Sequence, residues 1–218
     1  TITKRALGKL DEEADAFKMN DDWVTDFFER CRNISNVKMQ ELWATILAGE
    51  ANRAGAYSKK MLDIVADLEQ DHAEQFTILS KLSVGFKNTQ KGTIHTKIDC
   101  FVGRFEHLQE IYKIYYHDLK QLEALGLISI DPESVYVIPT NPKYKYRAVF
   151  HEHTALIDPK DNRINAGKLQ FTPWGKELAK AVLALDDKNL TETQKYWKRI
   201  RSEFGKKLGS AARYRLLG

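Results

Sequence analysis

The sequence has 218 residues, of which 43% are hydrophobic and 29% are charged, so it can bury the core of one or two domains. No run of 18 apolar residues occurs, so we expect no membrane span and predict a cytoplasmic protein without a membrane partner. The net charge of +4 is uneven, because residues 188–218 have nine Lys/Arg and two Asp/Glu, a balance of +7, and residues 1–187 sum to −3. A basic end on a mildly acidic body favours an acidic partner such as nucleic acid.

Residues 1–90 predict a helical subdomain. Asn20 or Asp21 is suited to cap a first clear helix, expected at 21–32. Apolar residues recur on one face of that helix, at Trp23, Phe27 and Cys31.

A second helix is predicted at 36–49, with Ser35 as its cap. Its apolar stripe is expected to lie in the core and consists of Met39, Leu42, Trp43, Ile46 and Leu47. Ser58 is suited to cap a third helix at 59–68, and a fourth is predicted at 70–82.

Residues 91–187 follow a different pattern, with a long helix and several short strands. We expect this helix at 105–125, with Gly126 as a left-handed C-cap residue. Apolar segments predict strands at 127–130, 135–139, 144–157 and 163–171, the last two joined by a turn at 158–162. Thr172 and Pro173 then begin another helix, as its cap and its first residue.

The order of a leucine-rich helix, Leu-Gly-Leu-Ile, strands, Thr-Pro and a helix resembles a winged-helix module with an enlarged β wing. The resemblance implies binding to nucleic acid or to another protein, and rarely chemistry. After it, the pair Thr191 and Gln194 has the spacing of a capping box and predicts a last helix. The predicted fold is therefore α+β and mostly α. It has a helical subdomain at 1–90, a winged-helix-like module at 91–187 and a basic C-terminal helix at 188–218.

A further motif runs through the first helices, at Asp22-Trp23, Phe27-Phe28, Ile34-Ser35, Met39-Gln40, Leu42-Trp43 and Ile46 to Glu50, followed by Tyr57-Ser58. It resembles a bacterial domain-of-unknown-function family with the pattern W…FF…IS…MQ.LW..ILAGE, in which Pro-Gly is usual where this chain has Ala54-Gly55. The resemblance implies no activity, and it implies a further N-terminal region before Thr1. Within the motif, we expect solvated or capping roles for Gln40, Glu41 and Glu50.

The sequence offers little for catalysis. It has no phosphate-binding loop of the Gly-x-x-x-x-Gly-Lys type, no Gly-x-Ser-x-Gly elbow and no cysteine pair with zinc spacing. Cys31 and Cys100 lie far apart among apolar residues, and we expect free buried thiols. On a strand, His151 and His153 would share a face and could ligate one metal ion, although no third ligand is evident. We therefore predict a non-enzymatic chain without a cofactor, metal ion or small-molecule substrate, and an enzyme using these two histidines is the third alternative.

Two basic segments favour nucleic acid, with DNA ahead of RNA. The predicted contacts to phosphate are Lys143, Lys145 and Arg147 in the wing and Lys198, Arg199, Arg201, Lys206 and Lys207 in the tail. The predicted helix at 105–125 is less suited, because its Lys113 and Lys120 alternate with acidic residues. The alternative function is a protein-interaction or oligomerisation module in a bacterial regulatory or antiphage defence system. It would use aromatic residues at Tyr112, Tyr115, Tyr116 and Trp197, which could equally lie in the core, with a homodimer or another protein as the partner.

Overall fold

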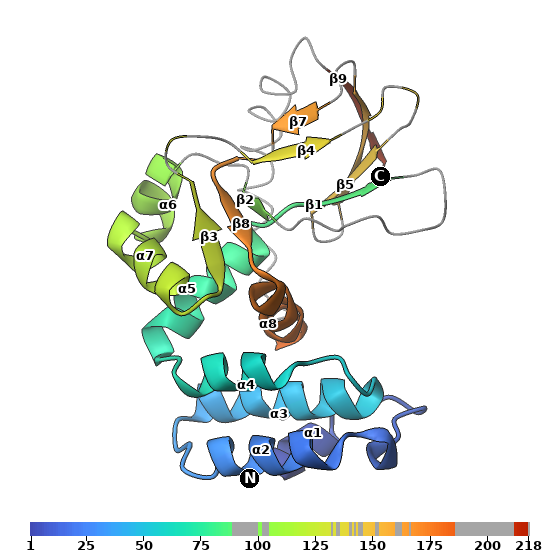
Figure 1. Cartoon of the computed structure of the whole chain (residues 1–218), viewed down its shortest axis with the longest axis vertical. Helices are drawn as coiled ribbons and strands as arrows, with labels where there is room; N and C mark the ends of the chain where they lie inside the picture. Colours follow the sequence, from blue (N-terminus) through green and yellow to red (C-terminus); the bar gives the residue numbers. More distant parts are fainter. Residues whose placement is uncertain are drawn as a thin grey trace. The chain divides into compact units, whose positions relative to one another are not determined.

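The computed structural model describes residues 1–88, 100–101, 105–131, 133, 136–139, 141, 143, 146–150, 153–159, 163–165, 167–185 and 212–217. The chain forms two compact units (Figure 1). The helical unit contains Thr1–Ser80, Lys120–Leu127 and the described part of Thr172–Lys188, and the second unit contains the other described residues. Helices account for more of the described chain than strands do, as predicted. None of the helices in these ranges is long and apolar enough to cross a membrane.

The helical unit is built around its longest helix. Its helices are α1 (Ile2–Leu7), α2 (Asp21–Cys31), α3 (Val37–Asn52), α4 (Lys59–Ala66), α5 (Gln70–Lys81) and α8 (Pro173–Leu185), with a short 3-10 helix η1 (Ala16–Lys18). Helix α3 contacts α1, α2 and α8, so it is apolar on several faces rather than on one stripe. The predicted apolar stripe of α3 is buried in full, as Met39, Leu42, Trp43, Ile46 and Leu47 are all 7% exposed or less.

Aromatic side chains join α2 to α3. Trp23 stacks on Phe27 with ring centroids 5.3 Å apart, and Phe27 meets Trp43 edge to face at 5.2 Å. Both tryptophans and Phe27 are 3% exposed or less, so the predicted apolar face of α2 is confirmed. Cys31 on the same face is a free, buried thiol, and burial raises its pKa.

Short polar side chains begin these helices, as the sequence predicts. Asn20 accepts a hydrogen bond from the Trp23 amide at 3.0 Å, and Ser58 accepts one from the Met61 amide at 3.2 Å. The prediction for α3 was wrong by one residue, because Asn36 rather than Ser35 accepts from the Met39 amide at 3.1 Å. An Asn side chain caps as well as a Ser, so residue type does not distinguish two adjacent positions of this kind.

The second unit combines helices and antiparallel sheets. Helix α6 covers Phe105–Tyr112 and α7 covers Tyr116–Ala124, whose last residues belong to the helical unit. The strands are β1 (Gly85–Asn88), β2 (Cys100–Phe101), β3 (Ile128–Ile130), β4 (Val137–Pro139), β5 (Tyr146–Phe150), β6 (His153–Pro159), β7 (Arg163–Asn165), β8 (Leu169–Phe171) and β9 (Ala212–Leu217). They form a four-stranded sheet in the order β1-β5-β6-β9, a three-stranded sheet in the order β2-β8-β3 and the pair β4-β7.

The single helix predicted at 105–125 is two helices. Lys113 adopts a positive φ of 57° between α6 and α7, which ends the first helix. The buried Asp118 carboxylate then accepts a hydrogen bond from the Tyr115 amide at 2.7 Å, as the third residue of a capping box does for the residue before a helix. Helical spacing of apolar residues continues across the break, and this continuity made the prediction wrong.

Two predicted strands are also divided. The segment 144–157 forms β5 and β6, which pair with each other from Tyr146 opposite Ile157 to Phe150 opposite His153, so the chain reverses between them. The segment 163–171 forms β7, which pairs with β4, and β8, which pairs with β2 and β3. Gly167 has a φ of 94° just before β8, a conformation that favours glycine.

The end of the predicted C-terminal helix is a strand. Ala212–Leu217 forms β9 and pairs with β6, and Arg213, Tyr214 and Arg215 in its middle alternate as strand residues do. The rest of that predicted helix lies outside the described residues. The predicted boundaries near residues 90 and 187 stay a prediction.

Candidate nucleic-acid interface

The register of the four-stranded sheet aligns basic residues from three strands. Lys87 in β1 lies opposite Arg147 in β5, Arg147 lies opposite Leu156 in β6, and Leu156 lies opposite Arg215 in β9. Opposed residues lie on the same face of a sheet, and neighbouring strands are about 4.8 Å apart. This alignment therefore puts three basic residues at register positions on one face of the sheet, spread over about 14 Å of backbone. We call Lys87, Arg147 and Arg215 the basic row.

The two faces of this sheet differ in composition. On the face of the basic row, Arg213 lies opposite Asp158, so that pair adds no net charge. The opposite face is mostly apolar, because its register positions are Phe86, Ala148, Ala155, Leu216, Asn88, Tyr146, Ile157, Tyr214, Phe150, His153, Pro159 and Ala212. Period-two alternation in β5, β6 and β9 thus keeps the basic residues on one face, which they share with Val149, Leu156 and Leu217.

Hydrogen bonds before β5 position Lys143, one of the two described basic residues of the predicted wing. The Tyr146 hydroxyl accepts a hydrogen bond from the Asn141 amide at 2.9 Å, and the Asn141 side chain accepts one from the Lys143 amide at 2.9 Å. Tyr146 is 8% exposed and anchors this loop to the sheet, whereas Lys143 is exposed. Lys143 is thus available to an anion next to the start of β5.

The surface of α6 and α7 has a more balanced charge. Lys120 forms an ion pair with Glu123, and the Lys113 ammonium donates to the Glu110 carbonyl at 3.1 Å. His117 is 73% exposed, but its Nε2 lies 3.1 Å from a carboxylate oxygen of Asp118. These partners leave little positive charge for phosphate on α7, as the sequence predicts.

Aromatic side chains are instead the main exposed feature of that surface. Tyr115 is 40% exposed, Tyr116 is 53% exposed and Ile111 is 37% exposed. The rings of Tyr115 and His117 stack with centroids 5.8 Å apart and planes inclined by 13°. Exposed aromatics of this kind suit contact with a base or with a protein.

The structure describes only some of the predicted site residues. Arg147 lies in the basic row and Lys143 in the loop before β5, whereas Lys145, Lys198, Arg199, Arg201, Lys206 and Lys207 lie outside the described residues. Sequence analysis missed Lys87 and Arg215, because single cations in short strands stand out only once the register is known. The alternation of lysine and tyrosine near residue 145 was the sequence feature that indicated this sheet as a basic site.

The predicted placement of His151 and His153 on one face of a strand stays a prediction. His153 begins β6 after the chain has reversed from β5, and His151 lies outside the described residues. No group of three or more His, Cys, Asp and Glu that could hold a metal ion occurs in the part of the chain that the structure describes.

The sequence motif of the first helices forms a clamped loop between α3 and α4. The Glu50 carboxylate, 1% exposed, accepts hydrogen bonds from the amides of Gly55 at 2.5 Å and Tyr57 at 3.0 Å. Glu177 of α8 accepts from both the amide and the hydroxyl of Ser58, at 2.8 and 2.7 Å. The Tyr57 ring covers Gly49 so closely that a Cβ at Gly49 would lie 2.8 Å from it.

These contacts give the motif a structural role. Glu50 caps a loop, as expected, although it is buried rather than solvated. Burial, followed by the charges of Glu50 and Glu177, raises the pKa of Tyr57 to about 12.

A family model described as a protein of unknown function, DUF2806, matches residues 1–195. The chain belongs to the DUF2806 family. No curated protein and no solved structure matches the chain.

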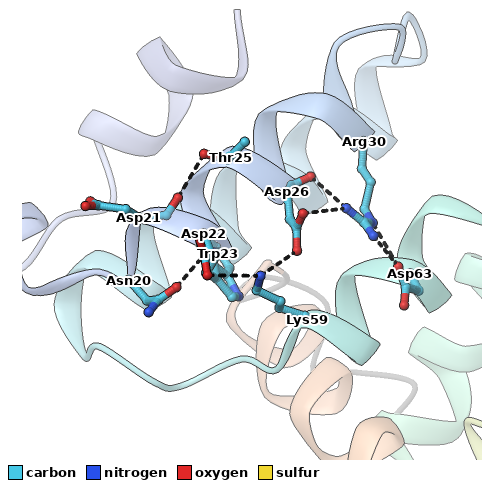
Figure 2. A network of polar contacts seen from close by, with 9 residues as sticks. All are labelled: Asn20, Asp21, Asp22, Trp23, Thr25, Asp26, Arg30, Lys59 and Asp63. Carbon is cyan, nitrogen blue, oxygen red and sulfur yellow. Dashed lines mark hydrogen bonds and ion pairs between the residues drawn. The ribbon is translucent and has the colours of Figure 1, made fainter.

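The matched range contains a polar network between α2 and α4 (Figure 2). Arg30 lies 2.5 Å from Asp63 and 3.5 Å from Asp26, and Lys59 lies 3.0 Å from Asp26. The hydrogen bond from Lys59, together with the charge of Arg30, lowers the pKa of Asp26. Since each of these cations is paired, the network fastens two helices and does not offer an anion site in this member of the DUF2806 family.

Proposed function

We propose that this DUF2806 chain is a non-enzymatic nucleic-acid-binding module that contacts phosphates through the basic row and the loop before β5. The observation that supports this most strongly is the register that aligns Lys87, Arg147 and Arg215 on one face of the sheet. Cations on one face of a sheet whose other face is apolar are suited to a polyanion. The basic tail, with Lys198, Arg199, Arg201, Lys206 and Lys207, would extend the same charge.

We also propose a winged-helix arrangement for the part of the chain around α6 and α7. A winged helix places a short strand, two helices and a two-stranded wing around one small antiparallel sheet. Support comes from the chain order β2, α6, α7, β3 and β8 and from the strand order β2-β8-β3. The segment between β3 and β8, which contains β4 to β7, would be the enlarged wing.

The salt dependence of binding tests the proposed function. Each neutralised phosphate contributes about −0.9 to the slope of log K against log salt for duplex DNA. Four contacts from the basic row and Lys143 would by themselves lower affinity about a hundredfold between 50 and 200 mM salt, and contacts from the tail would steepen this fall. Fluorescence anisotropy with random duplex and single-stranded oligonucleotides measures this, and duplex should bind more tightly.

The tail provides a separate arm of that experiment. Charge reversal at Lys198, Arg199 and Arg201 should lower both the affinity and the slope. Absence of binding at 50 mM salt would contradict the proposal. Binding whose salt slope is zero would contradict the assignment to phosphate contacts.

A protein partner is the second candidate function, and the exposed aromatics favour it. Tyr115 and Tyr116 have the size and amphipathic character of residues that anchor protein interfaces. If this surface binds a second copy, sedimentation should show a dimer for the wild type and a monomer for a Tyr115→Ser, Tyr116→Ser variant. A wild type that stays monomeric at high concentration would remove the homodimer.

A further inference from the structure

Three exposed aromatic residues follow one another where α6 gives way to α7, in the second unit. They are Tyr115, Tyr116 and His117. Ile114 before them and Leu119 after them are 2% exposed or less. The aromatic side chains therefore extend into solvent from a backbone that is anchored in the core on both sides.

One buried carboxylate fixes two of these three residues. One oxygen of Asp118 accepts a hydrogen bond from the Tyr115 amide at 2.7 Å, and the other lies 3.1 Å from Nε2 of His117. Asp118 is buried, and polar contacts are stronger where the surroundings have a low dielectric constant. The backbone of Tyr115 and the imidazole of His117 are therefore held in position without a ligand, which reduces the entropy that binding would cost.

The rings of the two fixed residues are stacked, and we call Tyr115 and His117 the stacked pair. Their planes are inclined by 13° and their centroids lie 5.8 Å apart. Tyr115 covers one face of the imidazole, and the His117 side chain is still 73% exposed, so its other face is open. An aromatic cage surrounds a cation with several ring faces, which two parallel rings cannot do. The stacked pair instead suits a further flat ring.

The charge beside the stacked pair favours a base over a phosphate. Its charged partner is the Asp118 carboxylate, which would repel a phosphate. Stacking needs no surplus cation, because every nucleobase has a π face. The basic row and Lys143 belong to the same unit as the stacked pair and would supply the phosphate contacts.

We propose that the stacked pair binds an unpaired base of a nucleic acid on the open face of His117. Binding of a base here rests on the proposed function, because the basic row would hold the phosphates of the same molecule. A base inside a duplex is covered on both faces by its neighbours. The substrate is therefore a duplex with an unpaired base beside it, such as a duplex with an overhang.

Two overhangs that differ only in their bases test the proposal. Duplexes with a short overhang of adenines or of abasic sites have the same number of phosphates, and anisotropy compares both with a blunt duplex. The adenine overhang should bind about tenfold more tightly than the abasic one, with the same salt slope. Equal affinities of the two overhangs would overturn base binding, and salt-sensitive binding of the blunt duplex would then leave the proposed function standing. Absence of binding by all three duplexes would contradict both.

Variants locate the site through the ratio of the two overhang affinities. His117→Ala should reduce this ratio to about one, and Tyr115→Leu should lower it, whereas His117→Phe keeps a ring and should keep the ratio. The matched control Phe17→Ala removes an exposed ring from the helical unit and should leave the ratio unchanged. Circular dichroism checks that each variant is folded. An unchanged ratio in folded His117→Ala and Tyr115→Leu proteins would overturn the assignment.

A fluorescent base distinguishes stacking from a protein interface. Aminopurine placed in the overhang loses emission when it stacks, so the wild type should quench it more strongly than His117→Ala does. Equal quenching by the two proteins would contradict stacking on His117. If the wild type is a dimer that Tyr115→Ser, Tyr116→Ser dissociates, and the overhang bases do not change the affinity, the surface belongs to a second copy and the proposal fails.

Discussion

At Gly175 the surrounding structure should reverse the usual stabilising effect of replacing a helical glycine by alanine. Gly175 is the third residue of α8, and replacing glycine by alanine inside a helix ordinarily stabilises by about 1 kcal/mol. A Cβ at Gly175 would lie 1.9 Å from the Leu127 carbonyl oxygen, which is a backbone atom and cannot rotate away. That oxygen also accepts a hydrogen bond from the Thr172 amide at 3.1 Å.

We therefore expect Gly175→Ala to destabilise the protein. Overpacking costs about 1–3 kcal/mol, and displacing the Leu127 carbonyl weakens a hydrogen bond of about 1 kcal/mol, which offsets the gain in helix propensity, so the net loss is about 1–3 kcal/mol. Urea unfolding followed by tryptophan fluorescence measures it. Gly8→Ala is the matched control, because its nearest atom is 3.7 Å away and its φ is −73°, and it should change stability by less than about 0.5 kcal/mol. A Gly175→Ala protein as stable as the wild type would refute the reasoning.

Three further predictions concern buried polar groups. Glu50→Ala should cost about 3 kcal/mol in urea unfolding, because it leaves the amides of Gly55 and Tyr57 without their acceptor; a loss below 0.5 kcal/mol would contradict the clamp. The pKa of Tyr57 is about 12 in the folded protein and 10.0 in the unfolded chain. Its contribution to the free energy of unfolding is therefore present below pH 10, and up to about 3 kcal/mol of that free energy is lost as pH rises towards 12. The free energy of unfolding of a Tyr57→Phe variant should lack this decrease at alkaline pH. If that free energy depends on pH identically in the variant and the wild type, the raised pKa of Tyr57 is contradicted. Asp118→Ala removes the acceptor of the Tyr115 amide and should cost about 1–2 kcal/mol, with Asp118→Asn recovering part of it; equal stability of all three proteins would refute the capping role.

Local signals in the sequence predicted the helical unit well. The caps Asn20 and Ser58 and the stripe from Met39 to Leu47 depend on neighbours a few residues apart, and the structure confirms them. Gly126 likewise has the expected positive φ of 79°, and the Thr172 hydroxyl accepts from the Gly175 amide at 3.0 Å to cap α8.

Features that depend on distant residues could not be predicted in the same way. The break at Lys113 lies within an unbroken helical pattern, and the chain reversal between Phe150 and His153 lies within an unbroken strand pattern. The basic row needs the register of four strands, and Glu177 reaches Ser58 across 119 residues of sequence. Periodicity gives the face of an element, and it does not give the partner of that face.

Reversing the charge of the basic row tests the proposed function most directly. We would compare the wild type with a Lys87→Glu, Arg147→Glu, Arg215→Glu variant by anisotropy with duplex DNA across a salt series. The control reverses three exposed lysines of the helical unit, Lys4, Lys60 and Lys180. We expect the basic-row variant to lose at least tenfold in affinity and its salt slope to shrink by about 2.7, whereas the control changes little. A basic-row variant that binds with the affinity and slope of the wild type would contradict the account.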